Sequence, residues 1–294
     1  MRSIAFELLR RVFEDDAYAN LLLPKLLAEA NVDSRDAGFI QELSFGTLRN
    51  KLFYEKVIAV ASSRDIASID SNALTVLLLG AHQLLGMRVP VHASINESVN
   101  LAKAKASKSV VGFVNAVLRR ISEKSRQQWV EIVTQDTKTA EEKLSIEHSH
   151  PLWIVRALKG ALESRGLGHS LENLLIADNI PAKVSVAALP GFSSIRSLAN
   201  YGEPGEASPI AVELNVTPAN VPEIKQGYAR VQDQGSQLAV LALVNAEVRV
   251  EDSVWLDVCA GPGGKAALMS AIATSRGIIF EANESSEHRA KLVE

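Results

Sequence analysis

The sequence predicts a multidomain chain with an all-α helical domain, a small α+β domain and the start of an α/β domain. Three observations support this prediction. Apolar residues recur at helical spacing up to about Lys124. Short mixed elements separated by proline and glycine follow Pro151, and a strand–turn–helix–strand pattern follows Asp252. We place the domains at residues 1–145, 146–230 and 231–294.

The first domain is predicted to be helical from Ser3 to about Lys124. Asp33 with Ser34, and Ser71 with Asn72, are candidate N-caps, while Pro90 ends the segment after Met87. The polar stretch 124–147 is predicted to form a helical linker or the last helix of this domain. The apolar residues that carry the helical spacing are Ile4, Leu8 and Val12, then Leu21, Leu22 and Leu26, then Leu74, Leu77 and Leu78, and then Val114, Val117 and Leu118.

The second domain is predicted from shorter elements. One helix passes through Trp153, Val155 and Leu158, and another runs from Leu171 to Ala177. The run Ala182–Ala187 reads as a strand, and the prolines and glycines that follow it mark turns.

The third domain begins with an apolar helix, Leu238–Val244, for which Asp233 or Ser236 is the candidate cap. Ser253–Val258 is then predicted to be a strand, Gly263–Ala273 a helix and Gly277–Ala282 a second strand. This order is that of a βαβ unit.

Bulk composition limits the class of protein. The 294 residues are 47% hydrophobic, but the longest apolar runs are shorter than the roughly 20 residues that cross a bilayer. Charged residues interrupt the N-terminal apolar pattern, so a signal peptide is not expected. The one cysteine fits a reducing compartment. We therefore expect a cytoplasmic protein without a membrane span.

The net charge of −3 gives no global attraction to nucleic acid, so any RNA contact must come from a local patch. A solvated helix face and an RNA-binding surface both remain open for the best basic cluster. We expect Arg35 and Arg49 to pair with Asp36 or Glu42, and we expect no metal site, because His148 and His150 lack a third ligand. The basic cluster consists of Lys103, Lys105, Lys108, Arg119, Arg120, Lys124 and Arg126.

A glycine-rich turn, Ala260–Gly264, separates the strand of the predicted βαβ unit from its helix. Such a turn lets the backbone approach a ligand and directs free N–H groups and the helix dipole toward it. A phosphate-binding P-loop would need a glycine five positions before Gly264 and a Ser or Thr after the lysine. Cys259 and Ala266 occupy those two positions, so the P-loop interpretation fails twice.

Two adenosine-containing cofactors remain as candidates for this turn. Gly261–Ala266 satisfies the G-x-G-x-x-A pattern of dinucleotide-binding turns, and Glu284, about twenty residues on, could bind the ribose of either cofactor. Asp257 ends the strand where the ammonium of S-adenosylmethionine would be held, and Pro262 is unusual in a pyrophosphate-binding turn. These two residues favour S-adenosylmethionine over NAD. A plain structural turn capped by Asp257 is the alternative without a ligand.

The string Asp257–Lys265 resembles the first motif, D-x-C-A-[AG]-P-G-G-K, of the ribosomal RNA cytosine-C5 methyltransferases of the RsmB (Fmu/Sun) type. Upstream strings resemble the NusB-like helical domain of that family, among them Gly46–Arg49, Asn96–Val99 and Gly112–Arg119. The resemblance implies a Rossmann-like methyltransferase domain and small-subunit ribosomal RNA as substrate. It also implies that Glu284 binds the cofactor's ribose and that the loop contacts S-adenosylmethionine through Cys259, Ala260, Gly261, Pro262, Gly263, Gly264 and Lys265.

The resemblance also implies two catalytic cysteines downstream of the loop, which would lie beyond Glu294. Cys259 is the only cysteine of the sequence, and we expect it to be a small buried residue rather than a nucleophile. We therefore expect an incomplete catalytic domain and no methylation by this chain on its own. We also expect a monomer that binds no DNA. A non-catalytic RNA- or protein-binding NusB-like module and a nicotinamide-dependent enzyme are the alternative functions.

Overall fold

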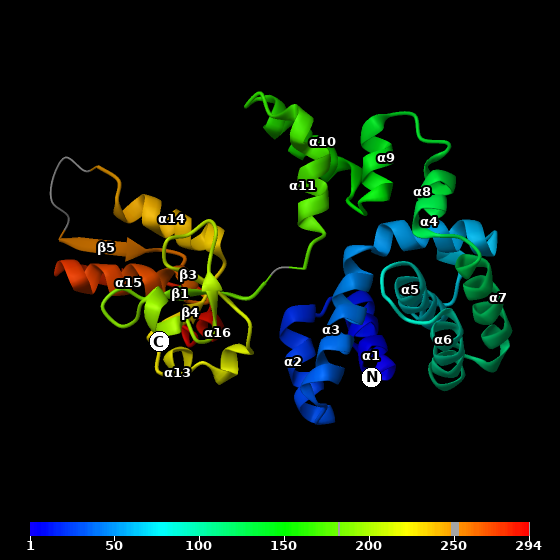
Figure 1. Cartoon of the computed structure of the whole chain (residues 1–294), viewed down its shortest axis with the longest axis horizontal. Coiled ribbons are helices and arrows are strands. Elements are labelled where there is room, and N and C mark those ends of the chain that lie inside the picture. Colours follow the sequence, from blue (N-terminus) through cyan, green and yellow to red (C-terminus); the bar gives the residue numbers. More distant parts are fainter. Residues whose placement is uncertain (182, 248–252, 294) are drawn as a thin grey trace. The chain divides into compact units, whose positions relative to one another are not determined.

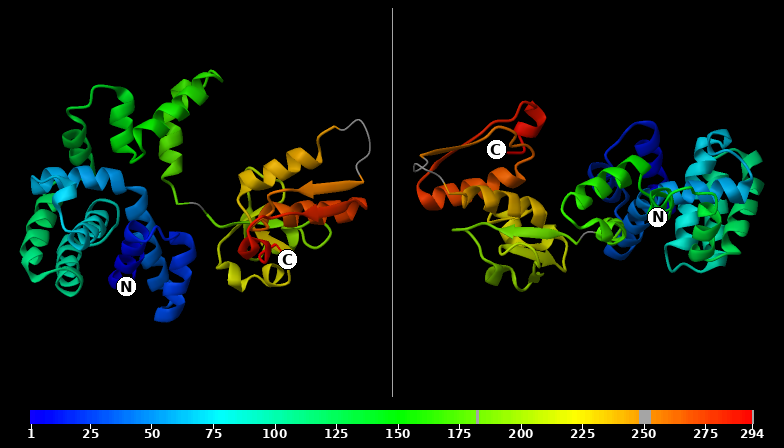
Figure 2. Two further views of the ribbon diagram at one scale, coloured as in Figure 1. Left: turned by 180° about the vertical axis from the view of Figure 1, so that it is seen from behind. Right: turned by 90° about the horizontal axis from the view of Figure 1, so that it is seen from above.

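The computed structural model describes residues 1–181, 183–247 and 253–293. The chain divides into two compact units, Met1–Ile180 and Pro181–Glu294. The first unit contains helices alone, and the second contains strands and helices (Figures 1 and 2). This confirms the predicted order of fold classes, while the boundaries of the three predicted domains stay predictions. No described helix is long and apolar enough to cross a membrane.

The helical unit is built around α5 (Ser71–Leu85), which Figure 1 shows end-on among its neighbours. Ten of its fifteen residues are buried, because α1, α3, α4, α6 and α7 pack against it. The resulting core is a single cluster of aliphatic and aromatic side chains. The remaining α-helices are α1 (Arg2–Glu14), α2 (Ala19–Ala30), α3 (Ser34–Arg49), α4 (Lys51–Ser62), α6 (Val91–Lys105), α7 (Val111–Ser122), α8 (Arg126–Thr134), α9 (Ala140–Glu147), α10 (Leu152–Glu163) and α11 (Leu171–Asp178).

Helix caps confirm one predicted start and correct another. The Asp33 carboxylate accepts a hydrogen bond from the Asp36 N–H, as expected for the N-cap of α3. The N-cap of α5 is Asp70, whose carboxylate accepts from the Ala73 N–H, whereas the predicted caps Ser71 and Asn72 lie inside the helix. The polar stretch 124–147 forms two helices, α8 and α9, each with its own side-chain cap.

A buried histidine lies where α3, α4 and α5 meet. His82 is 2% exposed, its Nδ1 lies 2.9 Å from the Tyr54 hydroxyl, and its Nε2 lies 3.4 Å from the Glu42 carboxylate. Gly46 makes room for the ring, since a Cβ at this position would lie 2.1 Å from His82 Nε2. The hydrogen bond with His82 is the main cause that lowers the pKa of Glu42. Glu42 also pairs with Arg49, as the sequence predicts.

Arg35 makes no ion pair with any described carboxylate, so its predicted pairing is wrong. Adjacent residues of a helix point in different directions, which separates the side chains of Arg35 and Asp36. Arg35 is exposed in the first turn of α3.

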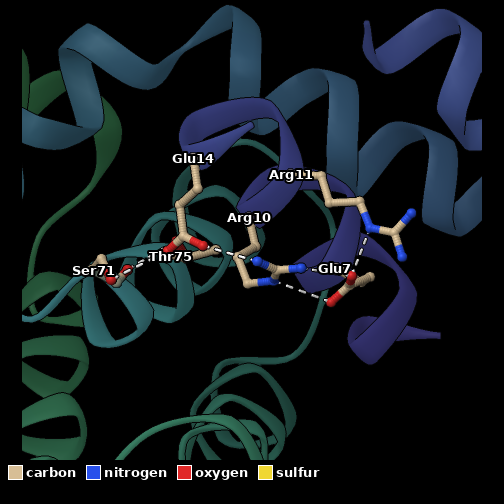
Figure 3. A network of polar contacts seen from close by, with 6 residues as sticks. All are labelled: Glu7, Arg10, Arg11, Glu14, Ser71 and Thr75. Carbon is tan, nitrogen blue, oxygen red and sulfur yellow. Dashed lines mark hydrogen bonds and ion pairs between the residues drawn. The ribbon is translucent and has the colours of Figure 1, made fainter. Parts of the chain in front are cut away.

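An ion-pair network connects α1 to the start of α5 (Figure 3). Arg10 binds Glu7 at 3.0 Å and Glu14 at 2.9 Å on its own helix, and the Ser71 hydroxyl donates to Glu14 across 3.4 Å. Because these side chains are partly exposed, each pair contributes only modestly to stability.

The last helices of this unit form a small cluster of their own. Val155, Leu171 and Leu175 are buried together, and Leu144 of α9 packs against them. His150 lies in the turn before α10, where its Nδ1 is 2.7 Å from the His148 carbonyl oxygen and its Nε2 is 3.7 Å from Asp178. Among the described residues, no group of three or more His, Cys, Asp and Glu side chains could hold a metal ion.

The second unit contains two sheets. The antiparallel sheet has the order β2-β3-β1-β4, and short helices pack beside it. The strand predicted at 182–187 begins at Ser185, and Ala182 lies outside the described residues. The elements up to the glycine-rich loop are β1 (Ser185–Ala188), α12 (Ile195–Leu198), β2 (Gly202–Pro204), β3 (Ala211–Leu214), α13 (Pro222–Lys225), β4 (Ala229–Val231), α14 (Gln234–Val244) and β5 (Val254–Asp257).

The predicted βαβ unit is present. β5 and β6 (Ile279–Ala282) are parallel, with Val254 opposite Ile279 and Asp257 opposite Ala282, and α15 (Gly264–Arg276) connects them. Trp255 and Phe280 pack against the core formed by α14 and α15. The opposite face of this sheet is exposed, with Val254, Leu256 and Ile279 each at least 47% accessible.

Candidate functional site

The glycine-rich loop lies between the carboxyl end of β5 and the first turn of α15. In parallel α/β folds this is the edge of the sheet at which ligands bind. The loop is held to the next strand by backbone hydrogen bonds, because the Asn283 N–H donates to the Asp257 carbonyl at 2.8 Å and the Ala260 N–H donates to the Asn283 carbonyl at 3.0 Å. The loop therefore has a fixed position relative to the end of β6.

The geometry favours glycine at two of the loop positions. A Cβ at Gly261 would lie 2.3 Å from a carboxylate oxygen of Glu284. Gly263 has φ +104°, a conformation that side-chain-bearing residues rarely adopt. Because Gly263 has no side chain and α15 has no side-chain cap, the first N–H groups of the helix are left for another acceptor.

Glu284 connects the loop to the turn after β6. One carboxylate oxygen accepts the Gly261 N–H at 3.0 Å, and the other accepts the Ser286 N–H at 3.0 Å. Arg289 lies 3.7 Å away as a counter-ion. The Ser286 hydrogen bond, followed by the charge of Arg289 and the Gly261 hydrogen bond, lowers the pKa of Glu284. The carboxylate is therefore kept ionised beside the loop.

Asp257 and Cys259 form the entrance to the loop. Asp257 is half-buried at the end of β5, and its Oδ1 accepts the Cys259 N–H at 3.0 Å. Cys259 is exposed, so the expectation of a buried cysteine is wrong. The side chain that faces inward in this loop belongs to Ala260, which is 4% exposed.

The family comparisons match two segments of the chain. Residues 1–123 match the NusB family, and residues 242–294, which include the loop and Glu284, match the family described as 16S rRNA methyltransferase RsmB/F. One segment of the chain is therefore similar to the NusB family, and another is similar to the RsmB/F methyltransferase family.

Comparisons that extend over the whole of this chain agree with these two matches. The chain is 40% identical over 296 residues to the Mycobacterium tuberculosis protein named "Putative methyltransferase Rv1407", with 99% of this chain and 64% of that protein covered. It is 28% identical over 305 residues to the ribosomal RNA small subunit methyltransferase B of Photorhabdus laumondii, with 100% of this chain and 65% of that protein covered. The chain thus spans just under two thirds of the length of these relatives.

A solved structure shows the same fold. The crystal structure of PH0851 superposes with a TM-score of 0.69 at 14% identity, covering 99% of this chain and 64% of that one. At this level of identity the likeness concerns the fold alone.

Two arginines that local sequence patterns do not indicate contact the glycine-rich loop. Arg230, on β4, donates to the Pro262 carbonyl at 3.1 Å, and Arg289 donates to the Gly261 carbonyl. Arg230 lies far from the loop in the sequence, and only the packing of β4 near α15 brings it there. Lys265, by contrast, is exposed and has no partner among the described residues.

Gln232 is a further residue beneath the loop. It is 6% exposed, and neither its amide nitrogen nor its amide oxygen has a hydrogen-bond partner among the described residues. Its Cγ lies 3.9 Å from the position that a Cβ on Gly264 would take. A buried amide without hydrogen-bond partners destabilises the folded state. Its position beside the glycine-rich loop is therefore consistent with a polar ligand that would supply the missing partners.

The residues present fit S-adenosylmethionine. The loop offers backbone N–H groups and close approach at glycines, and Asp257 and Glu284 offer two carboxylates of the kind that bind an ammonium group and ribose hydroxyls. The orphaned Gln232 amide adds one donor and one acceptor group close to the loop.

Proposed function

We propose that this chain acts in the S-adenosylmethionine-dependent methylation of cytosine C5 in small-subunit ribosomal RNA. The observation that carries the proposal is the hydrogen bond from the Gly261 N–H to the Glu284 carboxylate. It brings the glycine-rich loop and the candidate ribose-binding acid, both within the segment that matches RsmB/F, into one site. The names of the relatives support ribosomal RNA as the substrate.

In this proposal each loop residue has a separate task. Asp257 holds the methionine ammonium, and Glu284 accepts hydrogen bonds from the ribose hydroxyls. The backbone of residues 259–265 forms the wall against which the cofactor lies. Arg230 and Arg289 hold the loop through the Pro262 and Gly261 carbonyls. When bound, S-adenosylmethionine supplies an electrophilic methyl group.

Calorimetric titration of the purified chain with S-adenosylmethionine, S-adenosylhomocysteine and NAD tests this assignment. We expect heat from the first two ligands and none from NAD. Glu284→Gln is expected to weaken binding of both adenosyl ligands. The matched control is Glu287→Gln, an exposed neighbour whose carboxylate pairs, among the described residues, with Lys291 alone. Binding of NAD alone would favour the nicotinamide-dependent alternative. Binding of no ligand would favour a non-catalytic RNA-binding module.

A further inference from the structure

Two exposed aromatic side chains lie against each other on the second unit, outside the glycine-rich loop. The rings of Phe192 and Tyr228 are stacked, with their centroids 5.9 Å apart and an angle of 22° between their planes. Phe192 is 52% exposed and Tyr228 is 42% exposed. Two large rings that stay exposed side by side form a patch, and such patches mark binding sites more often than single exposed residues do.

The backbone holds both rings in place. Gly191 and Gly227 directly precede the two aromatic residues and have φ +85° and +76°, so each ring is carried by a tight turn. The Phe192 N–H donates to the Leu189 carbonyl at 3.0 Å. The Leu189 N–H donates to the Tyr228 carbonyl at 3.2 Å and thereby joins the two turns. Because the turns are already connected, a ligand that binds the rings has little backbone left to order.

A hollow of about 370 Å³ extends from this pair to the first turn of α15. Phe192 and Gly227 line it, as do Ala266 in the first turn of α15 and Ala282, the last residue of β6. Ala282 lies opposite Asp257 in the parallel sheet. The hollow therefore reaches the carboxyl edge of this sheet, where the candidate cofactor site lies.

Two cationic side chains lie close to the aromatic pair in the sequence. Arg196, on α12, follows Phe192 by four residues. Lys225, on α13, precedes Tyr228 by three residues. Both cations are exposed, and neither forms an ion pair with a described carboxylate. Flat apolar rings beside free cations match a ligand that combines flat apolar groups with negative charge.

We propose that Phe192 and Tyr228 stack on bases of single-stranded RNA next to the methylated nucleotide. Every base has a π-face on which an aromatic ring can stack, and the bases of a single strand are free to do so. Arg196 and Lys225 would contact the adjoining phosphates. The choice of RNA rests on the proposed function, whereas the location rests on the aromatic pair and its hollow. A proline-rich peptide would contact the rings but would leave both cations without a role.

Removal of the rings gives the first test. Fluorescence anisotropy with a labelled 12-nucleotide single-stranded RNA, measured without cofactor, is expected to show at least fivefold weaker binding for Phe192→Leu/Tyr228→Leu, because leucine keeps apolar bulk but has no π-face. Phe192→Trp/Tyr228→Trp keeps both π-faces and is expected to bind within about twofold of the unmodified chain. Tyr18→Leu/Trp153→Leu removes two rings that are 75% and 71% exposed on the helical unit and is expected to have little effect.

Charge and base content give the second test. Arg196→Glu/Lys225→Glu is expected to weaken RNA binding at least tenfold and to lower the slope of log affinity against log salt by roughly 1.4, at about 0.7 for each lost phosphate contact. Lys25→Glu/Arg165→Glu makes the same change of charge at exposed positions of the helical unit and is expected to have little effect. An abasic 12-mer keeps the phosphates but offers no base to stack, so we expect it to compete at least tenfold less well than the RNA.

Unchanged RNA affinity in the leucine variant would overturn the proposal, as would equal competition by the abasic 12-mer or tighter binding of a proline-rich peptide than of RNA. Calorimetry with S-adenosylmethionine on the same variants separates the two proposals. We expect cofactor affinity to stay within about twofold, so loss of RNA binding with normal cofactor binding supports the role of the aromatic pair. Absence of cofactor binding in the unmodified chain would count against the proposed function and not against the aromatic pair.

Discussion

The orphaned amide of Gln232 gives a prediction whose sign is unusual for a buried substitution. Gln232→Met removes two polar atoms that have no partner among the described residues and keeps nearly the same volume. Burying an unpaired polar group costs about 1–3 kcal/mol, and a volume-conserving swap costs less than about 1.5 kcal/mol. Since two such groups are removed, we expect the substitution to stabilise the second unit by at least about 0.5 kcal/mol.

Gln237 provides the matched control from the same region. It is 0% exposed, its amide oxygen accepts the Ser208 hydroxyl at 2.7 Å, and its amide nitrogen donates to the Gln232 carbonyl at 2.9 Å. Gln237→Met leaves the Ser208 hydroxyl without its acceptor and the Gln232 carbonyl without its donor in a buried environment, and it also removes the hydrogen bond from the amide nitrogen to Ser185 Oγ. We expect it to destabilise the unit by about 1–3 kcal/mol for each group left unpaired.

Hydrogen–deuterium exchange of peptides from α14 and α15 measures the local free energy of opening in both variants. We expect slower exchange for Gln232→Met, faster exchange for Gln237→Met, and weaker binding of S-adenosylmethionine by Gln232→Met. Destabilisation by Gln232→Met, or the same sign of effect in both variants, would refute the reasoning.

Three further predictions concern single side chains. Glu284→Gln should weaken S-adenosylmethionine about tenfold or more by calorimetry, since hydrogen bonds to a charged group contribute about 1.5–3 kcal/mol, while the control Glu287→Gln should not. Gly46→Ala should lower the unfolding free energy of the helical unit by about 1–3 kcal/mol in urea titrations, because its Cβ would lie 2.1 Å from His82 Nε2, whereas Gly38→Ala, with no atom within 4 Å, should raise it. Folding lowers the pKa of Glu42, so the ionised carboxylate stabilises the helical unit above its ordinary pKa of 4.5, and this stabilisation is lost as the pH falls below that value. Glu42→Gln should therefore flatten the dependence of the unfolding free energy on pH below 4.5. An unchanged pH dependence would contradict the stabilising role of the ionised Glu42.

The helices and the βαβ unit could be predicted because local spacing determines them. The apolar residues of α1, α5 and α7 recur with the period of a helix that is buried on one face. The loop before α15 follows the end of a predicted strand and is rich in glycine, which is typical of a tight turn. The predicted N-cap of α5, Ser71 or Asn72, differs from the observed Asp70 because all three residue types are good caps and only backbone geometry selects among them.

The features that depend on packing could not be predicted from local spacing. Cys259 lies next to a buried alanine in a loop, and its exposure follows from which side of the loop faces the core. Arg230 and Gln232 approach the loop because β4 and the start of α14 pack near α15. Arg119 pairs with no described carboxylate, whereas Arg120 donates to the Ala61 carbonyl. The two residues are adjacent in the sequence, so local patterns cannot predict this difference.

The claim that residues 257–265 and Glu284 form an S-adenosylmethionine site is tested most directly by hydrogen–deuterium exchange of the purified chain with and without this ligand. We expect protection in peptides that cover residues 257–265 and 283–286, and no change in α1 to α11. Unchanged exchange at the loop in the presence of saturating ligand, or protection confined to the helical unit, would contradict the claim.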